Sequence, residues 1–169
     1  MRVILPDVLE PGLKVVFCGT AAGTVSARVG AYYAGPGNRF WPTLYLTGLT
    51  TRLLSPDEYR LLPVFGIGLT DLAKHTSGAD STLKVQDFDT KALRWKIKLN
   101  APLALAFDSK RAALEFYGRR TIDYGLQAEP LGSTAVFVLP STSGLATKHW
   151  DIEPWHAMVR WLEERTTTS

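Results

Sequence analysis

Short apolar runs alternate along this chain with segments in which apolar residues recur at helical spacing. The runs with almost no polar residue are VVFC at 15–18, PLALAF at 102–107 and AVFVL at 135–139. Continuous apolar runs of this length are typical of parallel β-strands, because both faces of such strands are buried. We therefore predict three buried strands at these positions.

The segments between the strands carry helix signals. Asn38 is a suitable N-cap for a helix whose apolar stripe includes Phe40, Trp41 and Leu44, and Gly48 ends it. The segment 88–99 fits both a helix and a strand, but its basic residues and capping aspartates favour a helix. The further predicted helices are 55–63, which Ser55 caps, 108–118, which Asp108 or Ser109 caps, and one that starts at Asp151.

The remaining segments are predicted as connections. We expect an extended lead-in at 1–13, a long loop with a helical turn at its start at 24–37, a short strand or tight turn at 65–72, a second polar loop at 73–86, and a frayed end at 166–169. Long loops in small domains are often functional, so 24–37 is the best candidate for an active-site loop.

Strands that alternate with helices predict an α/β fold. We expect a single domain over residues 1–169, built as a three-layer α/β/α sandwich around a mainly parallel sheet of about four strands. The strands that end at Cys18 and Leu139 open into loops rich in Gly, Ser and Thr, at 19–23 and 140–144. Ligands of open α/β sheets bind where strands end, so these two loops should border one ligand site.

Composition and charge reduce the number of protein classes to which this chain could belong. The chain has 169 residues, 46% of them hydrophobic, a formal net charge of +3, and one cysteine. A lone Cys18 inside an apolar run excludes a disulfide framework and favours a small buried side chain over a nucleophile. We expect no membrane span, no secretory signal, and a monomer in a reducing setting. Basic residues gather after position 90, where a solvated helix face is favoured over a phosphate-contacting surface.

Common catalytic motifs do not match. The first loop lacks the lysine of a phosphate-binding loop and the spacing of a dinucleotide fingerprint. The three histidines, His75, His149 and His156, are scattered, so no metal site is expected. No serine stands in a Gly-x-Ser-x-Gly elbow.

Four strings in order carry a specific resemblance: CGTAAG, GAYYAGPGNRFW, GLTDL and LPSTSGLA. Together they resemble the uracil-DNA glycosylase superfamily, and within it most of all the mismatch-specific uracil/thymine-DNA glycosylases. The resemblance extends from about Leu9 to the last helix, and PGNRFW at 36–41 is its most specific part.

The resemblance implies hydrolysis of the N-glycosidic bond of a base flipped out of DNA, the first step of base excision repair. It implies double-stranded DNA with uracil or mismatches as the partner, with single-stranded DNA as a second candidate. It implies no cofactor and a cytoplasmic, nucleoid-associated protein of bacterial type.

The resemblance also assigns residues by position. Gly19, Thr20 and Ala21 border the base, Tyr33 stacks on it, and Asn38 contacts the base, caps its helix, or does both. The residues that match the DNA-contacting motif are Ser141, Ser143 and Gly144, which hold phosphate oxygens, Leu145, which is the wedge, and Lys148, a nearby cation that a solvated lysine explains nearly as well.

The first motif departs from the family pattern. Ala21 stands where the family has a water-orienting asparagine, and Ala22 replaces a proline. Asp71 in GLTDL is the candidate replacement, because a carboxylate can accept a proton from water and stabilise an oxocarbenium-like state. An N-cap role for Asp71 is the alternative, and Asp80, Asp87 and Asp108 are weaker catalytic candidates.

Two functions therefore remain open at this point. One is a monofunctional uracil-DNA glycosylase that uses Asp71, with other deaminated or mispaired bases as further substrates. The other is a lesion-binding relative without catalysis, which the missing polar group at Ala21 suggests.

Overall fold

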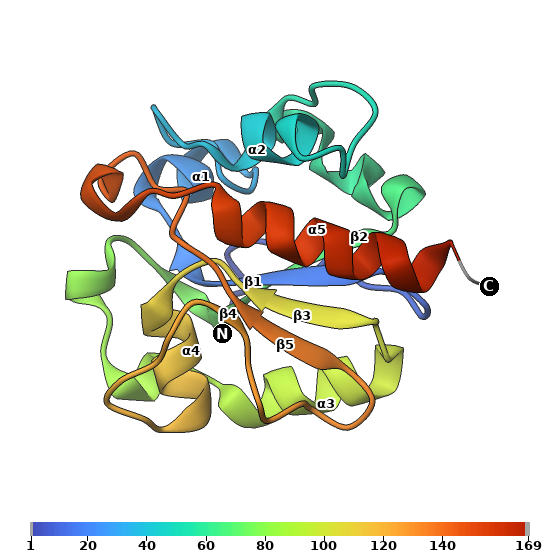
Figure 1. Cartoon of the computed structure of the whole chain (residues 1–169). Coiled ribbons are helices and arrows are strands. Elements are labelled where there is room, and N and C mark those ends of the chain that lie inside the picture. The colour runs from blue at the N-terminus through green and yellow to red at the C-terminus, as the bar shows by residue number, and fades with distance from the viewer. Residues whose placement is uncertain (1, 168–169) are drawn as a thin grey trace.

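A five-stranded sheet forms the centre of the structure, a computed structural model that describes residues 2–167 (Figure 1). The strands are β1 (Val15–Ala22), β2 (Ile67–Ser77), β3 (Ala104–Phe107), β4 (Gly125–Leu126) and β5 (Ala135–Val138). They lie in the order β2-β1-β3-β5-β4; β1 is parallel to β2 and β3, β5 is parallel to β3, and only β4 is antiparallel to its neighbour. The predicted α/β class with a mainly parallel sheet is confirmed.

Helices cover both faces of this sheet (Figure 1). The α-helices are α1 (Thr24–Val29), α2 (Phe40–Leu46), α3 (Thr90–Asn100), α4 (Lys110–Tyr117) and α5 (Glu153–Thr166). The 3₁₀ helices are η1 (Pro56–Phe65), η2 (Asp80–Thr82), η3 (Val85–Asp87) and η4 (Thr147–His149). The helices α1, α2 and α5 lie on one face and α3 and α4 on the other, which gives the three predicted layers.

Side-chain alternation along β1 produces two hydrophobic cores. Val15 and Phe17 belong to the core under α2 and α5, whereas Val16 and Cys18 belong to the core under α3 and α4. All four side chains are fully buried. Burial also raises the pKa of the Cys18 thiol well above its usual value, which fits a packing role and not a nucleophile.

Strand β2 is longer than predicted. It continues to Ser77, through residues predicted as a polar loop. Strand β2 lies at the edge of the sheet, and the N-terminal lead-in covers only part of it. Val8 exchanges backbone hydrogen bonds with Leu69, and the Ile4 amide donates to the Lys74 carbonyl at 2.8 Å. Polar side chains are tolerated on the rest of this edge, so the apolar signal of a strand is absent.

The remaining helix predictions differ only in detail. Strand β1 runs through Ala22, so the predicted first loop is largely strand, and the predicted loop at 24–37 begins with α1. Ser55 forms the expected capping box with Glu58. Helix α5 includes Thr166, the first residue of the predicted frayed end, and residues 168–169 of that prediction lie outside the described residues.

Candidate active site

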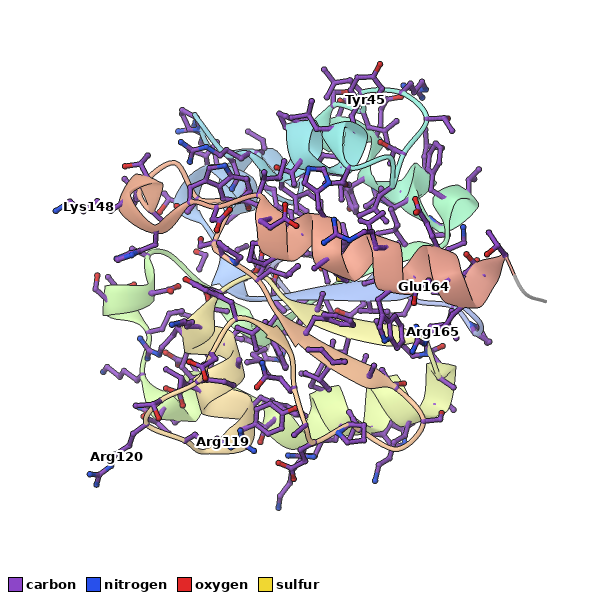
Figure 2. The ribbon with its side chains drawn as sticks, in the orientation of Figure 1. Tyr45, Arg119, Arg120, Lys148, Glu164 and Arg165 are labelled. Carbon is purple, nitrogen blue, oxygen red and sulfur yellow. The ribbon has the colours of Figure 1, made fainter. Side chains whose placement is uncertain are left out.

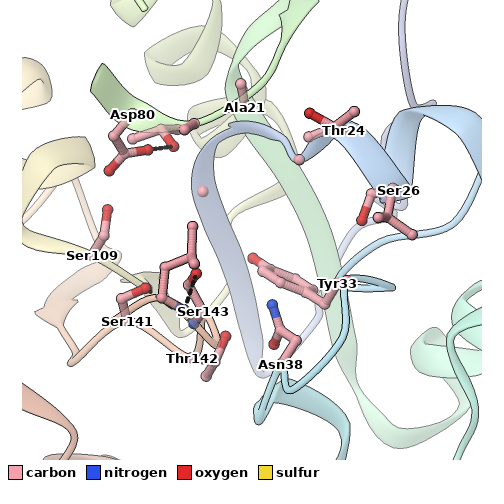
Figure 3. Close-up of a pocket in the computed structure, with 18 of the residues that line it drawn as sticks. Ala21, Thr24, Ser26, Tyr33, Asn38, Asp80, Ser109, Ser141, Thr142 and Ser143 are labelled. Atoms are coloured by element: carbon pink, nitrogen blue, oxygen red, sulfur yellow. Dashed lines mark hydrogen bonds between the residues drawn. The ribbon is translucent and has the colours of Figure 1, made fainter. Parts of the chain in front are cut away.

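A cavity of about 710 Å³ lies where β1, β2, β3 and β5 end (Figure 3). It collects segments that are far apart in the sequence: the end of β1, the segment after α1, η2, the start of α4 and the turn after β5. The predicted site residues that line it are Gly19, Thr20, Ala21, Tyr33, Asn38, Asp71, Ser141, Ser143, Gly144 and Leu145. The structure therefore brings these predicted residues together around one cavity, and their roles stay predictions.

Two carboxyl groups meet beside Gly19. Asp71 is the register partner of Gly19 in β2, and Asp108 directly follows β3 on the opposite side of β1. A Cβ added to Gly19 would lie 2.8 Å from Asp71 Oδ1, 3.4 Å from Asp108 Oδ1 and 3.5 Å from the hydroxyl oxygen of Tyr33. The three groups thus converge on one point, which is open only because residue 19 has no side chain.

Burial sets the protonation of this pair. Asp71 is 7% exposed and Asp108 is 6% exposed. Burial raises the pKa of Asp71 to about 6, an effect that the charge of Lys74 opposes. Burial raises the pKa of Asp108 to about 7, an effect that the nearby Tyr33 hydroxyl opposes and the charge of Asp71 reinforces. Between these two values, near pH 6.5, the pair therefore holds about one proton, mainly on Asp108.

An ion cluster lies behind Asp71. Lys74 and Lys96 contact the carboxylate of Asp7 at 2.8 and 2.6 Å, and the Thr70 hydroxyl donates to it at 2.7 Å. Burial works to raise the pKa of Asp7, but these partners hold it below its usual value. The two lysines also act on Asp71, so the lead-in that carries Asp7 helps to set the charge of the site.

Tyr33 is held in an unusual backbone conformation. Its φ of 54° is in the left-handed region, which is rare for a bulky residue. Hydrogen bonds on both sides fix it: Trp41 Nε1 donates to the Tyr32 carbonyl and the Ala34 amide donates to Ser26 Oγ. Its ring stacks on Phe40, with centroids 3.9 Å apart, so a ligand in the cavity would meet the other face of the ring.

The hydroxyl of Tyr33 is buried beside the carboxyl pair. Within residues 2–167 it has no hydrogen-bond partner of good geometry, although it lies close enough to Asp108 to affect its pKa. A buried hydroxyl without a partner carries a desolvation penalty, and such groups often serve a ligand or a reaction.

The two polar atoms of the Asn38 side chain face different surroundings. Its Oδ1 accepts a hydrogen bond from the Phe40 amide at 2.9 Å, close to the start of α2. Its amide nitrogen points into the cavity beside Tyr33 (Figure 3). The N-cap of α2 is Arg39, one residue later than predicted, although Asn38 still accepts from the first helical amide. The base contact stays a prediction.

The turn after β5 presents hydroxyl groups. Ser141 Oγ accepts from the Ser143 amide and Ser143 Oγ accepts from the Leu145 amide, each at 3.2 Å. Because the hydroxyl oxygens accept from the backbone, their protons are available to donate to an anion. Gly144 packs against the loop before α2, where an added Cβ would lie 2.7 Å from the Pro36 carbonyl oxygen.

Leu145 and Lys148 lie at the edge of the site. The Leu145 side chain lines the cavity mouth and is 89% exposed, as an unpaired wedge would be. Lys148 is exposed in η4 and points away from the ribbon (Figure 2). It is not among the residues that line the cavity, so its phosphate contact stays a prediction.

The structure shows different surroundings for each of the acidic catalytic candidates. Asp71 lies inside β2, so the alternative of an N-cap is wrong. Asp80 accepts a hydrogen bond from the Thr20 hydroxyl at 2.7 Å (Figure 3), and Asp87 accepts one from the Lys84 amide in η3. The sequence makes Asp108 a weaker catalytic candidate because an aspartate before a helix is usually a cap, but Ser109 is the N-cap of α4. Its position at the end of a parallel strand next to β1 was the signal that could have found it.

The sequence profile of the Uracil DNA glycosylase superfamily matches residues 6–163. The chain belongs to this superfamily. Among solved structures it is similar to the solution NMR structure of a candidate uracil DNA glycosylase from Methanosarcina acetivorans, with a TM-score of 0.61 and 22% sequence identity. That match covers 94% of this chain and 96% of the other, and it supports the same fold.

Superfamily membership supports a DNA glycosylase role for the cavity. Within the described residues, no group of three or more His, Cys, Asp and Glu side chains is arranged to hold a metal ion. None of the helices formed by residues 2–167 has the length and apolar character needed to cross a membrane.

Proposed function

We propose that this protein is a monofunctional DNA glycosylase that hydrolyses the N-glycosidic bond of uracil in DNA and so starts base excision repair. The observation that carries the proposal is the buried Asp71 carboxyl inside β2, in the same cavity as the ring of Tyr33. Membership of the superfamily supports DNA as the substrate.

The base would enter the cavity by flipping out of the duplex. The bond to be cut is inaccessible within the base stack, and a mispaired base costs less to extract. The cavity of about 710 Å³ is within the usual range for small-molecule sites. The flipped base stacks on the face of Tyr33 that Phe40 does not cover, and the Asn38 amide donates to a carbonyl oxygen of uracil.

Asp71 carries the chemistry in this proposal. As the bond breaks, positive charge develops on the sugar, and a carboxylate stabilises it most strongly where water is excluded. The same carboxylate accepts a proton from the attacking water. Because Ala21 lines the cavity without a polar group, this task falls to the neighbouring strand.

The turn after β5 holds the DNA. Ser141 and Ser143 donate their hydroxyl protons to phosphate oxygens, and Leu145 fills the space that the base leaves. The exposed position of Leu145 at the cavity mouth supports this division of roles.

The variant Asp71→Asn tests the proposal. We expect single-turnover release of uracil from a G·U duplex to fall by about 100-fold or more, because an amide cannot accept the proton. Binding of the same duplex should change little. Asp123→Asn, at an exposed position, is the matched control. An undiminished rate in Asp71→Asn would remove Asp71 from the mechanism.

A lesion-binding role without catalysis is the second candidate, and Ala21 is the observation that favours it. A product assay at enzyme excess with uracil, thymine, hypoxanthine and xanthine, paired and unpaired, separates the two. Tight binding with no free base from any substrate would select the binding role, and release of another base in place of uracil would correct the substrate.

A further inference from the structure

A second buried carboxyl group, that of Asp108, has no task in the reaction described above. It lines the cavity, it is as buried as Asp71, and its oxygen lies 3.4 Å from the point beside Gly19 at which Asp71 also arrives. Ser109 caps α4, so the Asp108 carboxyl is not needed there. A buried carboxyl without a structural task, in a cavity with a second carboxyl, calls for an explanation.

We propose that Asp108 is the general acid of this site, and that it donates a proton to the departing base while Asp71 accepts one from water. This role rests on the proposed glycosylase function. It uses the strand order directly, because β2 and β3 flank β1 and deliver the two carboxyl groups to opposite sides of Gly19.

The step balances in atoms and protons. The water oxygen forms a bond to the anomeric carbon of the sugar, and the bond from that carbon to the base nitrogen breaks with its electron pair on the base. The water proton goes to Asp71, and the Asp108 proton goes to the base. The products are an abasic sugar and a neutral free base.

The cycle closes when the proton on Asp71 returns to Asp108. The Tyr33 hydroxyl is placed for this transfer, since its oxygen lies 3.5 Å from the point at which both carboxyl groups meet. This use accounts for a buried hydroxyl that has no partner of good geometry in the described part of the chain.

The surroundings keep Asp108 protonated when Asp71 is ionised. The groups that act on Asp108 are Tyr33 from the segment after α1, Asp71 from β2 and Asp80 from η2. Burial is the largest effect and raises the pKa of Asp108 to about 7; the Tyr33 hydroxyl opposes it, and the charges of Asp71 and Asp80 reinforce it. Two acids whose environments separate their pKa values are the usual basis of an acid and base pair.

A change of leaving group tests the assignment. Fluorine at C5 of uracil stabilises the base anion, so 5-fluorouracil leaves with less help from an acid. At pH 6.5 we expect Asp108→Asn to slow single-turnover release of uracil by about 100-fold and of 5-fluorouracil by less than about 10-fold. The variant Asp71→Asn should slow both bases by similar factors, and Asp123→Asn should slow neither.

The outcomes are distinguishable. Equal losses for the two bases in Asp108→Asn would overturn the general-acid role and leave the proposed function intact. A wild-type protein that releases neither base would overturn the proposed function and this role with it. If Asp108→Asn does not fold, the wild-type rate on uracil decides: we expect it to fall as the pH rises through about 7, and a constant rate up to pH 9 would overturn the role.

Discussion

Because Gly19 has no side chain, space remains beside it for two carboxyl groups. Its register partner Asp71 and the neighbouring Asp108 both reach the space that a Cβ would occupy. The conformation of Gly19 is ordinary extended strand, so the requirement for glycine here is one of space and not of backbone freedom.

The substitution Gly19→Ala should therefore damage activity more than folding. The added Cβ would lie 2.8 Å from Asp71 Oδ1, so the carboxyl group must move. We expect base release to fall by about 10-fold or more, with a small change in melting temperature. Gly23→Ala is the matched stability control, because a Cβ there meets no atom within 4 Å. Normal activity in Gly19→Ala would show that the carboxyl pair tolerates displacement.

The raised pKa values of the two carboxyl groups also predict how stability depends on pH. Folding raises the pKa of Asp71 and Asp108 from 3.8 to about 6 and about 7. The folded protein then binds more protons than the unfolded chain between about pH 4 and 7, so its stability falls as the pH rises through this range. The loss is about 3 kcal/mol for Asp71 and about 4 kcal/mol for Asp108.

Asp71→Asn should remove its part of this loss. At pH 8 we expect the variant to melt about 8 °C above the wild type, and at pH 4.5 the two should melt within about 3 °C of each other. Thermal unfolding at the two pH values measures this. A difference that is the same at both would mean that Asp71 is not a buried charge at neutral pH.

At the scale of elements, the sequence predicted what local patterns encode. The apolar runs located β1, β3 and β5, and helix caps such as Ser55 and Ser109 located helix starts. The far half of β2 was missed because a partly covered edge needs no apolar alternation. The two residues of β4 are too few to leave a pattern, and their pairing depends on β5.

The site was predicted by resemblance more than by periodicity. The four strings placed Tyr33, Asn38 and Ser141 in one cavity, and the structure brings them together. The sequence alone does not place Asp108 beside Asp71, because a capping aspartate and one that lines a cavity look alike in sequence. Only the strand order shows that it faces Asp71.

The contact between two loops predicts a further effect. Gly144 lies against the Pro36 carbonyl, and the Arg39 amide donates to the Thr142 carbonyl at 2.8 Å. Gly144→Ala should push these loops apart, because backbone atoms cannot move aside as a flexible side chain does. We expect DNA binding to weaken by about 10-fold, since hydroxyl donors must be placed accurately to bind phosphate. Unchanged affinity in a gel-shift titration would contradict this.

At the scale of the whole molecule, several basic residues after position 90 pair with acidic side chains of the same chain. Lys96 pairs with Asp7, Arg111 with Glu115 and Arg119 with Glu129. Arg119 and Arg120 project from the α4 end of the molecule (Figure 2). The preference for a solvated helix face over a phosphate-contacting surface stays a prediction.

In the proposed function, Leu145 is the side chain that enters the duplex. The variant Leu145→Ala should leave the melting temperature unchanged, because the side chain is 89% exposed. We expect uracil release from duplex DNA to fall by about 10-fold and release from single-stranded DNA to change little, since a single strand leaves no gap to fill. Parallel assays on both substrates test this, and equal losses would argue against a wedge.

Added salt should weaken DNA binding but have little effect on the ion cluster of Asp7, Lys74 and Lys96. Ions screen contacts between exposed hydroxyl or basic groups and phosphates, so DNA affinity should fall steadily with ionic strength. The cluster is largely shielded from solvent, with the three side chains 12–21% exposed, and it should keep its influence on Asp71. Ionic strength therefore becomes a means of separating the two stages of the reaction: encounter with DNA slows, while cleavage of an already bound lesion proceeds at nearly the same rate.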